Sequence, residues 1–242
     1  MKNRFRYIAL YLGALLFYNR ESKVLFYHDI HDKNSYLEDS TPLPLFKKHI
    51  QTIRNESYEI VTDITQKHNQ IKLQFDDGFK GIYDCLSFLV VEKIPVEVFI
   101  ISSEIGNANF LSENQIIELS NSGLVKISSH SHSHLELNNI DEKTLKYELL
   151  HSKRILETLC NQTIDSICYP FGYFSPSVIE ECRSANYLYQ YSSIAGSFHE
   201  NIFDNVIKRN LVQFANIQEL KLILKGANAI FNILYFKRHF SK

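Results

Sequence analysis

The chain of 242 residues has no tryptophan, one methionine and only four cysteines. None of the cysteines forms the CxxC pair that is typical of structural zinc sites and redox centres, so the sequence supports neither. We interpret all four as buried, reduced thiols, and they give no sign of an oxidising compartment. The aromatic content comes instead from 14 tyrosines and 17 phenylalanines, which predict an aromatic-rich core.

The sequence also has no large excess of positive or of negative charge. The sequence has 26 Lys and Arg against 27 Asp and Glu, so its total charge predicts no binding to nucleic acid. Internal repeats and low-complexity linkers are absent as well. With 45% hydrophobic residues, a chain of this length can bury one full core, and we expect a single folded unit.

No apolar run reaches the roughly 20 residues that a membrane-spanning helix needs. Residues 7–18 come closest; they follow Lys2, Arg4 and Arg6 but precede no small-x-small cleavage site. Residues 220–240 are apolar at helical spacing and end in a basic cluster. Both helices either anchor the protein to a membrane surface or pack on its core. Under the first alternative we expect a membrane-associated protein on the cytoplasmic side, with the extracytoplasmic side also open.

Strand and helix patterns alternate between these two ends, which predicts parallel βα units. The strand candidates are 24–28, 58–61, 71–75, 96–101, 124–128, 166–169, 187–191 and 206–212. The helix candidates are 43–54, 81–92, 112–120, 141–159 and 176–184, and Ser112 and Asp141 are expected N-caps. Seven or eight such units form either a barrel or an open doubly wound sheet.

The position of the polar residues favours the barrel. The polar residues in question each lie at the C-terminal end of a predicted strand; they are His28, Asp76, Asp77, His130 and the Tyr169–Pro170 pair. The carboxyl ends of the strands are where the active sites of α/β barrels assemble. We therefore predict an α/β fold of the (β/α)7 barrel type with flanking N- and C-terminal helices.

The segment 75–78, FDDG, places two adjacent carboxylates after a strand, where a cation would relieve their repulsion. Alone, it fits a helix cap or a turn about as well. The segment 130–134, HSHSH, adds two imidazoles four residues apart. Asp77, His130 and His134 then form a two-His, one-Asp set for a catalytic divalent metal, with zinc first and Co, Ni, Fe or Mn also accepted. Asp76 becomes the candidate general base for a metal-bound water.

With these motifs the chain resembles the polysaccharide deacetylases. FDDG matches their first motif, HSHSH their H-[ST]-x-x-H motif, and residues 169–172, YPFG, their third. Tyr27–His28 matches the opening tyrosine-histidine pair of the branch that acts on extracellular and biofilm-type polysaccharides. The resemblance runs from about residue 24 to 212 and implies a distorted (β/α) barrel. It divides the chain into an N-terminal helix (1–22), a catalytic domain (23–214) and a C-terminal amphipathic helix (215–242).

The resemblance also implies roles for single residues. Asp76 is the base, Asp77, His130 and His134 are metal ligands, and His28 takes the place of the general acid. The turn at Pro170 would aim the Phe171 N–H at the developing oxyanion. Tyr169, Pro170 and Tyr173 are the expected substrate-binding residues, with the aromatic rings forming walls for a sugar and its acetyl group.

Two departures from the family pattern remain. The third motif often begins with an arginine that orients the base, and Cys168 stands there instead. Arg209 is the candidate replacement. The more familiar order supplies the acid as a late histidine, but His199 lies in a predicted loop, so we prefer His28.

We thus expect a metal-dependent hydrolase that releases acetate from N-acetyl groups, or from O-acetyl groups, of an amino-sugar polysaccharide or its precursor. Its partner would be an acetylated glycan and not nucleic acid. Two alternatives stay open. One is a non-catalytic member that binds glycan or supports a polysaccharide assembly complex. The other is an amide hydrolase of the same fold with a small non-sugar substrate.

Overall fold

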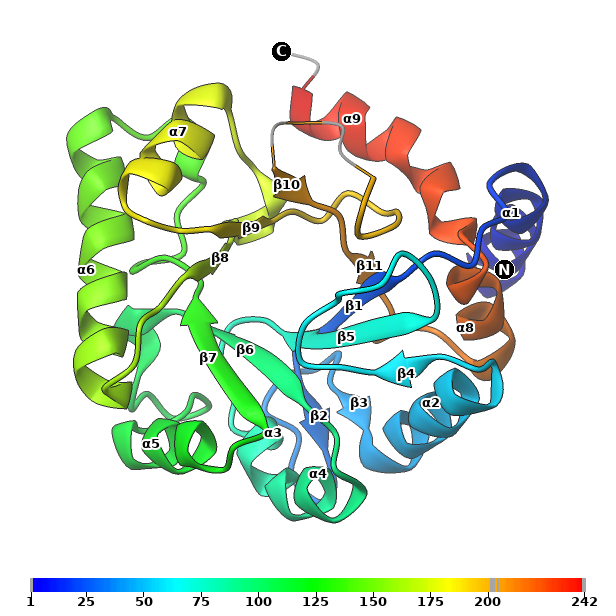
Figure 1. The fold of residues 1–242 in the computed structure, drawn as a ribbon, viewed down its shortest axis with the longest axis horizontal. Coiled ribbons are helices and arrows are strands. Elements are labelled where there is room, and N and C mark those ends of the chain that lie inside the picture. The colour runs from blue at the N-terminus through cyan, green and yellow to red at the C-terminus, as the bar shows by residue number, and fades with distance from the viewer. Residues whose placement is uncertain (1, 201–202, 204, 241–242) are drawn as a thin grey trace.

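The protein is described here by a computed structural model that covers residues 2–200, 203 and 205–240. Strands alternate with helices, and most strands form one curled, parallel sheet with helices around it (Figure 1). This arrangement confirms the predicted α/β barrel type. The strands are β1 Lys23–Tyr27, β2 Ile30–His31, β3 Thr41–Pro42, β4 Glu59–Ile60, β5 Gln70–Phe75, β6 Val96–Ile100, β7 Val125–Ser129, β8 Ser166–Cys168, β9 Tyr189–Tyr191, β10 Val206–Ile207 and β11 Asn210–Leu211.

The sheet has the order β10-β9-β8-β7-β6-β5-β1-β11, with β4 also paired to β5, while β2 and β3 form a separate pair. Its two edge strands, β10 and β11, are consecutive in the chain but do not pair with each other. The curled sheet is therefore open between them. The prediction of one strand over 206–212 was therefore wrong. Lys208 and Arg209 leave the strand direction between its two halves, and the Arg209 side chain is buried.

The strands have two buried faces of different character. On β5, Ile71, Leu73 and Phe75 belong to the core between sheet and helices. The alternating residues Lys72 and Gln74 are also buried, and both contact Glu97 of β6, with closest approaches of 3.0 and 2.7 Å. Because strand side chains alternate between faces, the inner face of the curled sheet is polar where its outer face is apolar. A charged side chain on the inner face therefore has polar or charged side chains within reach as partners.

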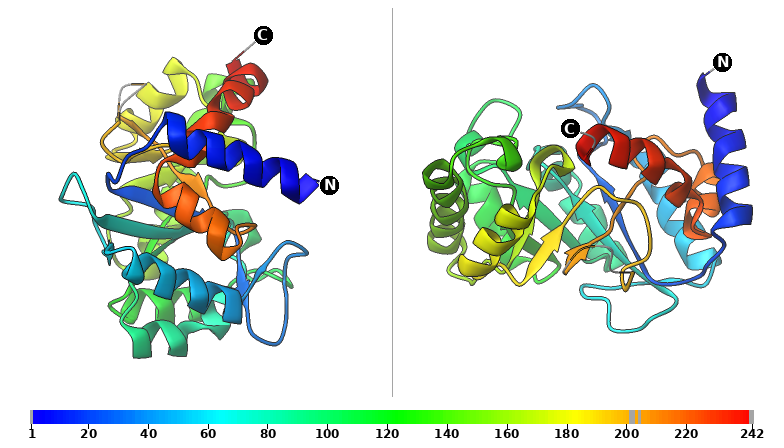
Figure 2. Two further views of the ribbon diagram at one scale, coloured as in Figure 1. Left: turned by 90° about the vertical axis from the view of Figure 1, so that its right-hand side faces the viewer. Right: turned by 90° about the horizontal axis from the view of Figure 1, so that it is seen from above.

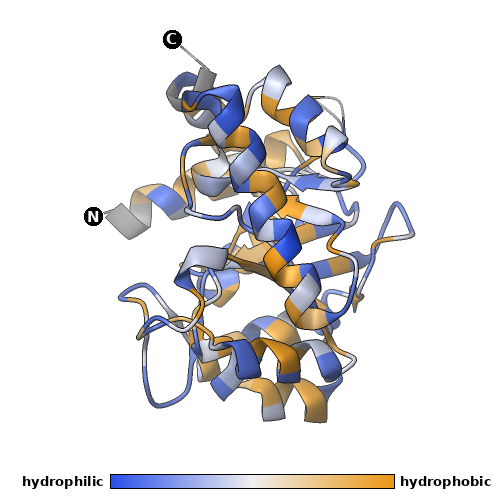
Figure 3. Cartoon of the chain, turned by 90° about the vertical axis from the view of Figure 1, so that its left-hand side faces the viewer, coloured by the Kyte–Doolittle hydropathy of each residue, from blue (hydrophilic) through white to orange (hydrophobic). Residues whose placement is uncertain are grey.

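The helices cover the outer face. They are α1 Lys2–Leu16, α2 Leu43–Asn55, α3 Gly81–Asp84, α4 Leu86–Glu92, α5 Glu113–Asn121, α6 Glu142–Cys160, α7 Pro176–Ser184, α8 Ile217–Leu224 and α9 Asn232–Phe240, with the short 3-10 helices η1 Ser102–Glu104, η2 Leu137–Asn139, η3 Pro170–Gly172 and η4 Ala227–Phe231. Most carry both hydrophobic and hydrophilic residues (Figure 3), as expected for one face on a sheet and one in solvent. Ser112 and Asp141 cap α5 and α6 as predicted.

Two helix predictions need correction. The helix expected over 81–92 is divided at Cys85 into α3 and α4. The C-terminal helix expected over 215–242 is interrupted and consists of α8, η4 and α9 as far as residue 240; residues 241 and 242 lie outside the described part of the chain. The interruption falls at Gly226, whose φ of 92° a continuous helix does not allow. These elements pack beside α1 on one side of the molecule (Figure 2). Among the described residues, no helix combines the length and the apolar character required to cross a bilayer.

Candidate active site

A cavity of about 500 Å³ lies at the carboxyl ends of the strands. Two backbone hydrogen bonds continue the parallel pairing one residue beyond the ends of β5 and β7. They fix the positions of the first polar residues after these two strands. The Asp76 N–H donates to the Tyr27 carbonyl at 3.0 Å, and the His130 N–H donates to the Ile100 carbonyl at 2.9 Å. The residues that line the cavity are Phe26, His28, Asp76, Asp77, His130, His134, Tyr169, Phe171, Ser193, Leu211 and Tyr235.

Asp77, His130 and His134 bring three ligand atoms together in this cavity. Asp77 Oδ1 lies 3.4 Å from His130 Nε2 and 3.6 Å from His134 Nε2. A tetrahedral zinc ion with bonds of about 2.0–2.2 Å separates its ligands by about 3.3–3.6 Å. Both distances from Asp77 have the spacing of a metal site, and all three ligand atoms lie within 4.8 Å of one another. The open side of the cavity leaves room for further ligands.

The two histidines differ in their protonation. His130 Nδ1 lies 2.8 Å from the Cys168 carbonyl. Since a carbonyl only accepts hydrogen bonds, Nδ1 carries a proton, and Nε2 is the ring nitrogen that faces Asp77. Burial opposes the charged form of His130, but Cys168 and the hydrogen bond to Asp77 raise its pKa above the usual histidine value, so metal binding at Nε2 would displace a proton. Burial lowers the pKa of His134 to about 4, so its imidazole is neutral at pH 7.

A second group of possible ligands, Asp76, His130 and Cys168, lies next to the first. A guanidinium occupies this group already, because Arg209 Nη2 is 2.8 Å from Asp76 Oδ2 and 2.7 Å from Cys168 Sγ. Burial also raises the pKa of the Cys168 thiol, whereas metals bind the thiolate. Asp77, His130 and His134 are therefore the better candidate ligands of the two groups.

The backbone around these ligands is strained. Asp77, Ser131, His134 and Phe171 have positive φ values of 71°, 64°, 56° and 56°. A non-glycine residue in this left-handed region costs roughly 1 kcal/mol or more, and such residues cluster at functional sites. Glu148 from α6 helps to hold the histidine loop, because its carboxylate accepts the N–H groups of His132 and Ser133 at 2.9 and 2.7 Å.

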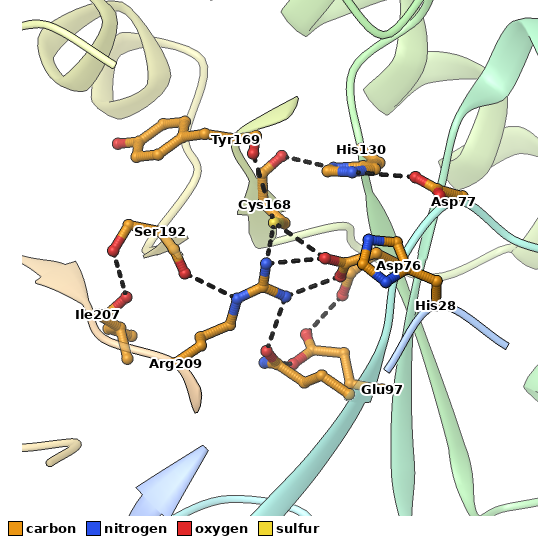
Figure 4. A network of polar contacts seen from close by, with 12 residues as sticks. His28, Asp76, Asp77, Glu97, His130, Cys168, Tyr169, Ser192, Ile207 and Arg209 are labelled. Carbon is orange, nitrogen blue, oxygen red and sulfur yellow. Dashed lines mark hydrogen bonds and ion pairs between the residues drawn. The ribbon is translucent and has the colours of Figure 1, made fainter. Parts of the chain in front are cut away.

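Asp76 forms a buried ion pair with Arg209, as the sequence predicted (Figure 4). Both oxygens of Asp76 accept bonds from the guanidinium, at 2.7 and 2.8 Å. The Phe26 ring lies 4.1 Å from the guanidinium carbon, and the Ser192 carbonyl accepts from its Nε. Burial alone would raise the pKa of Asp76, but the charge and hydrogen bonds of Arg209 outweigh it and lower this pKa to about 2. The arginine absent at position 168 is thus supplied by residue 209.

His28 is held by Gln213, a residue that we did not predict. Gln213 Oε1 lies 3.0 Å from the His28 backbone N and 2.6 Å from its Nδ1. An amide oxygen accepts, so Nδ1 carries a proton and the other ring nitrogen is left for the cavity. Gln213 comes directly after the strand expected over 206–212, and its strand-end position was the one signal that would have identified it.

The third motif forms a turn at the rim. Phe171 is half-exposed, and its ring centroid lies 4.4 Å from that of His134. Tyr169 lines the cavity but is buried, and its hydroxyl donates to Gln190. Pro170 is buried and Tyr173 is half-buried, and neither lines the cavity. His199 lies outside it as well, with Nε2 3.3 Å from the Gln66 carbonyl.

Comparison with known proteins gives a consistent result. The sequence model of the polysaccharide deacetylase domain matches residues 63–190. A Bacillus subtilis relative, the putative polysaccharide deacetylase YxkH, is 26% identical in an alignment over 175 residues that covers 68% of this chain and 61% of YxkH. The chain thus spans less than two thirds of the length of that curated relative.

Several solved structures share the fold. A polysaccharide deacetylase from Bacillus cereus has a TM-score of 0.73 at 23% identity, over 85% of this chain and 69% of the other. The Streptococcus pyogenes deacetylase PplD, solved with acetate, has a TM-score of 0.73 at 19% identity, over 84% and 98%. IcaB from Ammonifex degensii has a TM-score of 0.72 at 18% identity, over 88% and 99%.

We expect His134→Ala to lower the affinity for zinc or cobalt by at least about a hundredfold, because it removes one of three protein ligands. The matched control is His132→Ala, which deletes the middle imidazole of the same motif. Its ring faces Ser102 and His151 rather than Asp77. Metal content after dialysis measures both. Equal metal retention in the two variants would contradict the assignment.

We expect Arg209→Met to lower the free energy of unfolding at pH 7 by about 3–5 kcal/mol, because it leaves the Asp76 carboxylate buried without its cation. The pair stabilises the fold fully above the unfolded pKa of Asp76, near 4, and the gain is lost as the pH falls toward about 2. The deficit of the variant should therefore shrink below about pH 4. Urea unfolding measures it, with Arg54→Met at an exposed pair as the control, for which we expect about 0–1 kcal/mol. Equal losses in both variants would contradict a dominant role for the pair.

Proposed function

The chain belongs to the polysaccharide deacetylase family, and we propose that it is a metal-dependent hydrolase of carbon–nitrogen bonds that removes N-acetyl groups from an amino-sugar glycan. The observation that carries this proposal is the convergence of Asp77, His130 and His134 beside ionised Asp76 in one cavity. Removal of O-acetyl groups by the same site is the variant of this function that the same chemistry allows.

The metal ligands define what a bound ion contributes. A divalent ion at Asp77, His130 and His134 would supply a Lewis acid for the acetyl carbonyl and for a water molecule. Two imidazoles and one carboxylate suit zinc, and they also accept Co, Ni, Fe or Mn. The Cys168 carbonyl keeps His130 in the required tautomer throughout.

Two residues at the ends of different strands transfer the protons: Asp76, after β5, is the base, and His28, after β1, is the acid. Asp76 is ionised and accepts the proton of the attacking water, while Arg209 holds both carboxylate oxygens in place. The water oxygen bonds to the acetyl carbon, and the bond between that carbon and the sugar nitrogen breaks. His28 donates a proton to the departing nitrogen from the ring nitrogen that Gln213 leaves available. The products are acetate and an amine.

The rim residues shape the acyl pocket. Phe171 lies against His134 and walls the side of the cavity where the acetyl methyl group would sit. The left-handed turn at this residue presents its backbone next to the cavity, and the Phe171 N–H is our candidate donor to the developing oxyanion. Tyr169 acts behind this wall, since its buried ring supports the turn.

We expect the protein loaded with zinc or cobalt to release acetate from an N-acetylglucosamine oligosaccharide, and a chelator to abolish the release until metal is restored. The assay panel includes an O-acetylated glycan and a small aryl acetamide. Acetate from the aryl acetamide alone would indicate an amide hydrolase with a non-sugar substrate. Binding of the oligosaccharide without any release would indicate the non-catalytic alternative.

We expect His28→Gln to lower kcat for the N-acetylated oligosaccharide by about 10²–10⁴, the usual contribution of a general acid. Hydrolysis of 4-nitrophenyl acetate should fall far less, since nitrophenolate departs without a proton. Metal content should stay unchanged. Equal losses with both substrates would show that His28 does not act on the leaving group.

A further inference from the structure

The charges of the chain are divided between its terminal segments and its middle. The first 20 residues contain four basic residues and no acidic one, and residues 220–242 contain five basic residues and no acidic one. The 199 residues between them hold the other 17 basic residues and all 27 acidic ones. A chain that is almost neutral overall therefore has basic ends and an acidic body.

The structure places these two basic segments together. The backbone of Gly13 in α1 is so close to Ala227 of η4 that a Cβ on Gly13 would lie 2.3 Å from the Ala227 carbonyl oxygen. The Asn19 N–H donates to the Lys225 carbonyl at 3.1 Å. Figure 2 shows α1, α8 and α9 grouped on one side of the molecule. The described parts of both basic segments thus lie on that side.

Helix α1 has more apolar surface than its packing uses. A narrow stripe of Leu10, Gly13 and Ala14 is buried. The opposite side, which a helix on a globular protein normally fills with polar residues, is also apolar. We call this side the α1 apolar face; its exposed residues are Phe5, Ile8, Tyr11, Leu12, Leu15 and Leu16.

We propose that the α1 apolar face docks on the surface of an anionic lipid bilayer. A helix with apolar residues outward, a tyrosine among them, and basic residues at its start lies in the plane of a membrane interface and not across it. Lys2 and Arg4 lie at the start of α1, and lipid headgroups with negative charge complement a basic helix start. Arg6, half a turn further on, lies 3.9 Å from Glu219 and is not part of this match.

The charge pattern favours lipid over a second copy of this chain. A symmetric dimer through α1 would bring two basic segments together, and residues 1–20 and 220–242 contain no acidic residue to pair with them. A bilayer with anionic headgroups meets the same surface with the opposite charge. Exposed Ile233 and Leu234 of α9 add apolar area within the same basic segments.

Docking would also place the candidate active site beside the membrane. Tyr235 of α9 lines the active-site cavity and a neighbouring cavity of about 490 Å³, which Arg6 of α1, Phe214 and Phe231 line as well. Helix α9 therefore borders the site, and α1, which carries the docking surface, borders the neighbouring cavity. A glycan attached to or emerging at the bilayer would reach the cavity from this side.

The test is co-sedimentation of the full chain with vesicles of phosphatidylcholine, with and without one third phosphatidylglycerol. We expect binding to the anionic vesicles, at least tenfold weaker binding to phosphatidylcholine alone, and weakening as salt rises from about 0.1 M to about 1 M. The double variant Leu15→Glu and Leu16→Glu should lose at least tenfold in affinity, because it places two carboxylates on the docking face.

The matched control is Val91→Glu with Leu188→Glu. These side chains are 78% and 70% exposed, against 65% and 72% for Leu15 and Leu16, and the charge change is the same. The control should bind vesicles like the unmodified protein, and both variants should keep acetate release from a soluble oligosaccharide. No binding by the unmodified protein, or equal binding by both variants, overturns the proposal. A third outcome also overturns it: the unmodified protein binds no vesicles but forms a concentration-dependent dimer that the Leu15 and Leu16 substitutions dissociate. The α1 apolar face would then be the interface with a second copy of the chain.

Discussion

The buried pair of Arg209 and Asp76 is the interaction on which the rest of the structure depends. Arg209 lies between the two edge strands β10 and β11, where the curled sheet remains open, and its guanidinium crosses the interior to the end of β5. It links the last part of the barrel to the strand end from which both carboxylates start. The same contact keeps Asp76 ionised and leaves the adjacent Asp77 to face the two histidines.

This division of labour explains why two carboxylates can be neighbours in a buried place. Each has its own positive partner, a guanidinium for Asp76 and, in the proposed function, a metal ion for Asp77. The strained conformations of Asp77, His134 and Phe171 are held by the elements around them, including the Glu148 carboxylate and the Ser131 hydroxyl, which accepts the His134 N–H at 3.1 Å. Strain of this kind persists only where the surrounding fold determines it.

Much of this arrangement could be predicted from local patterns. The alternation of strands and helices predicted parallel βα units. The polar residues at the strand ends favoured the barrel and predicted the cavity, because the carboxyl ends of parallel strands share one edge. Residues 206–212 have the pattern of one strand, because no local sequence signal marks the point at Lys208 and Arg209 where the chain passes from one edge of the sheet to the other. Gln213 and Glu148 escaped prediction for a related reason. Each acts across at least 15 residues of sequence, on His28 and on the histidine loop, and such pairings have no periodic signal.

The most direct test of this account is a crystal structure of the protein grown with zinc or cobalt, with anomalous diffraction recorded at the metal edge. The account predicts one strong peak within about 2.0–2.2 Å of Asp77 Oδ1, His130 Nε2 and His134 Nε2, with the pair of Arg209 and Asp76 intact. A peak bound instead by Asp76 and Cys168, or no peak at any of these side chains in metal-loaded, active protein, would contradict it.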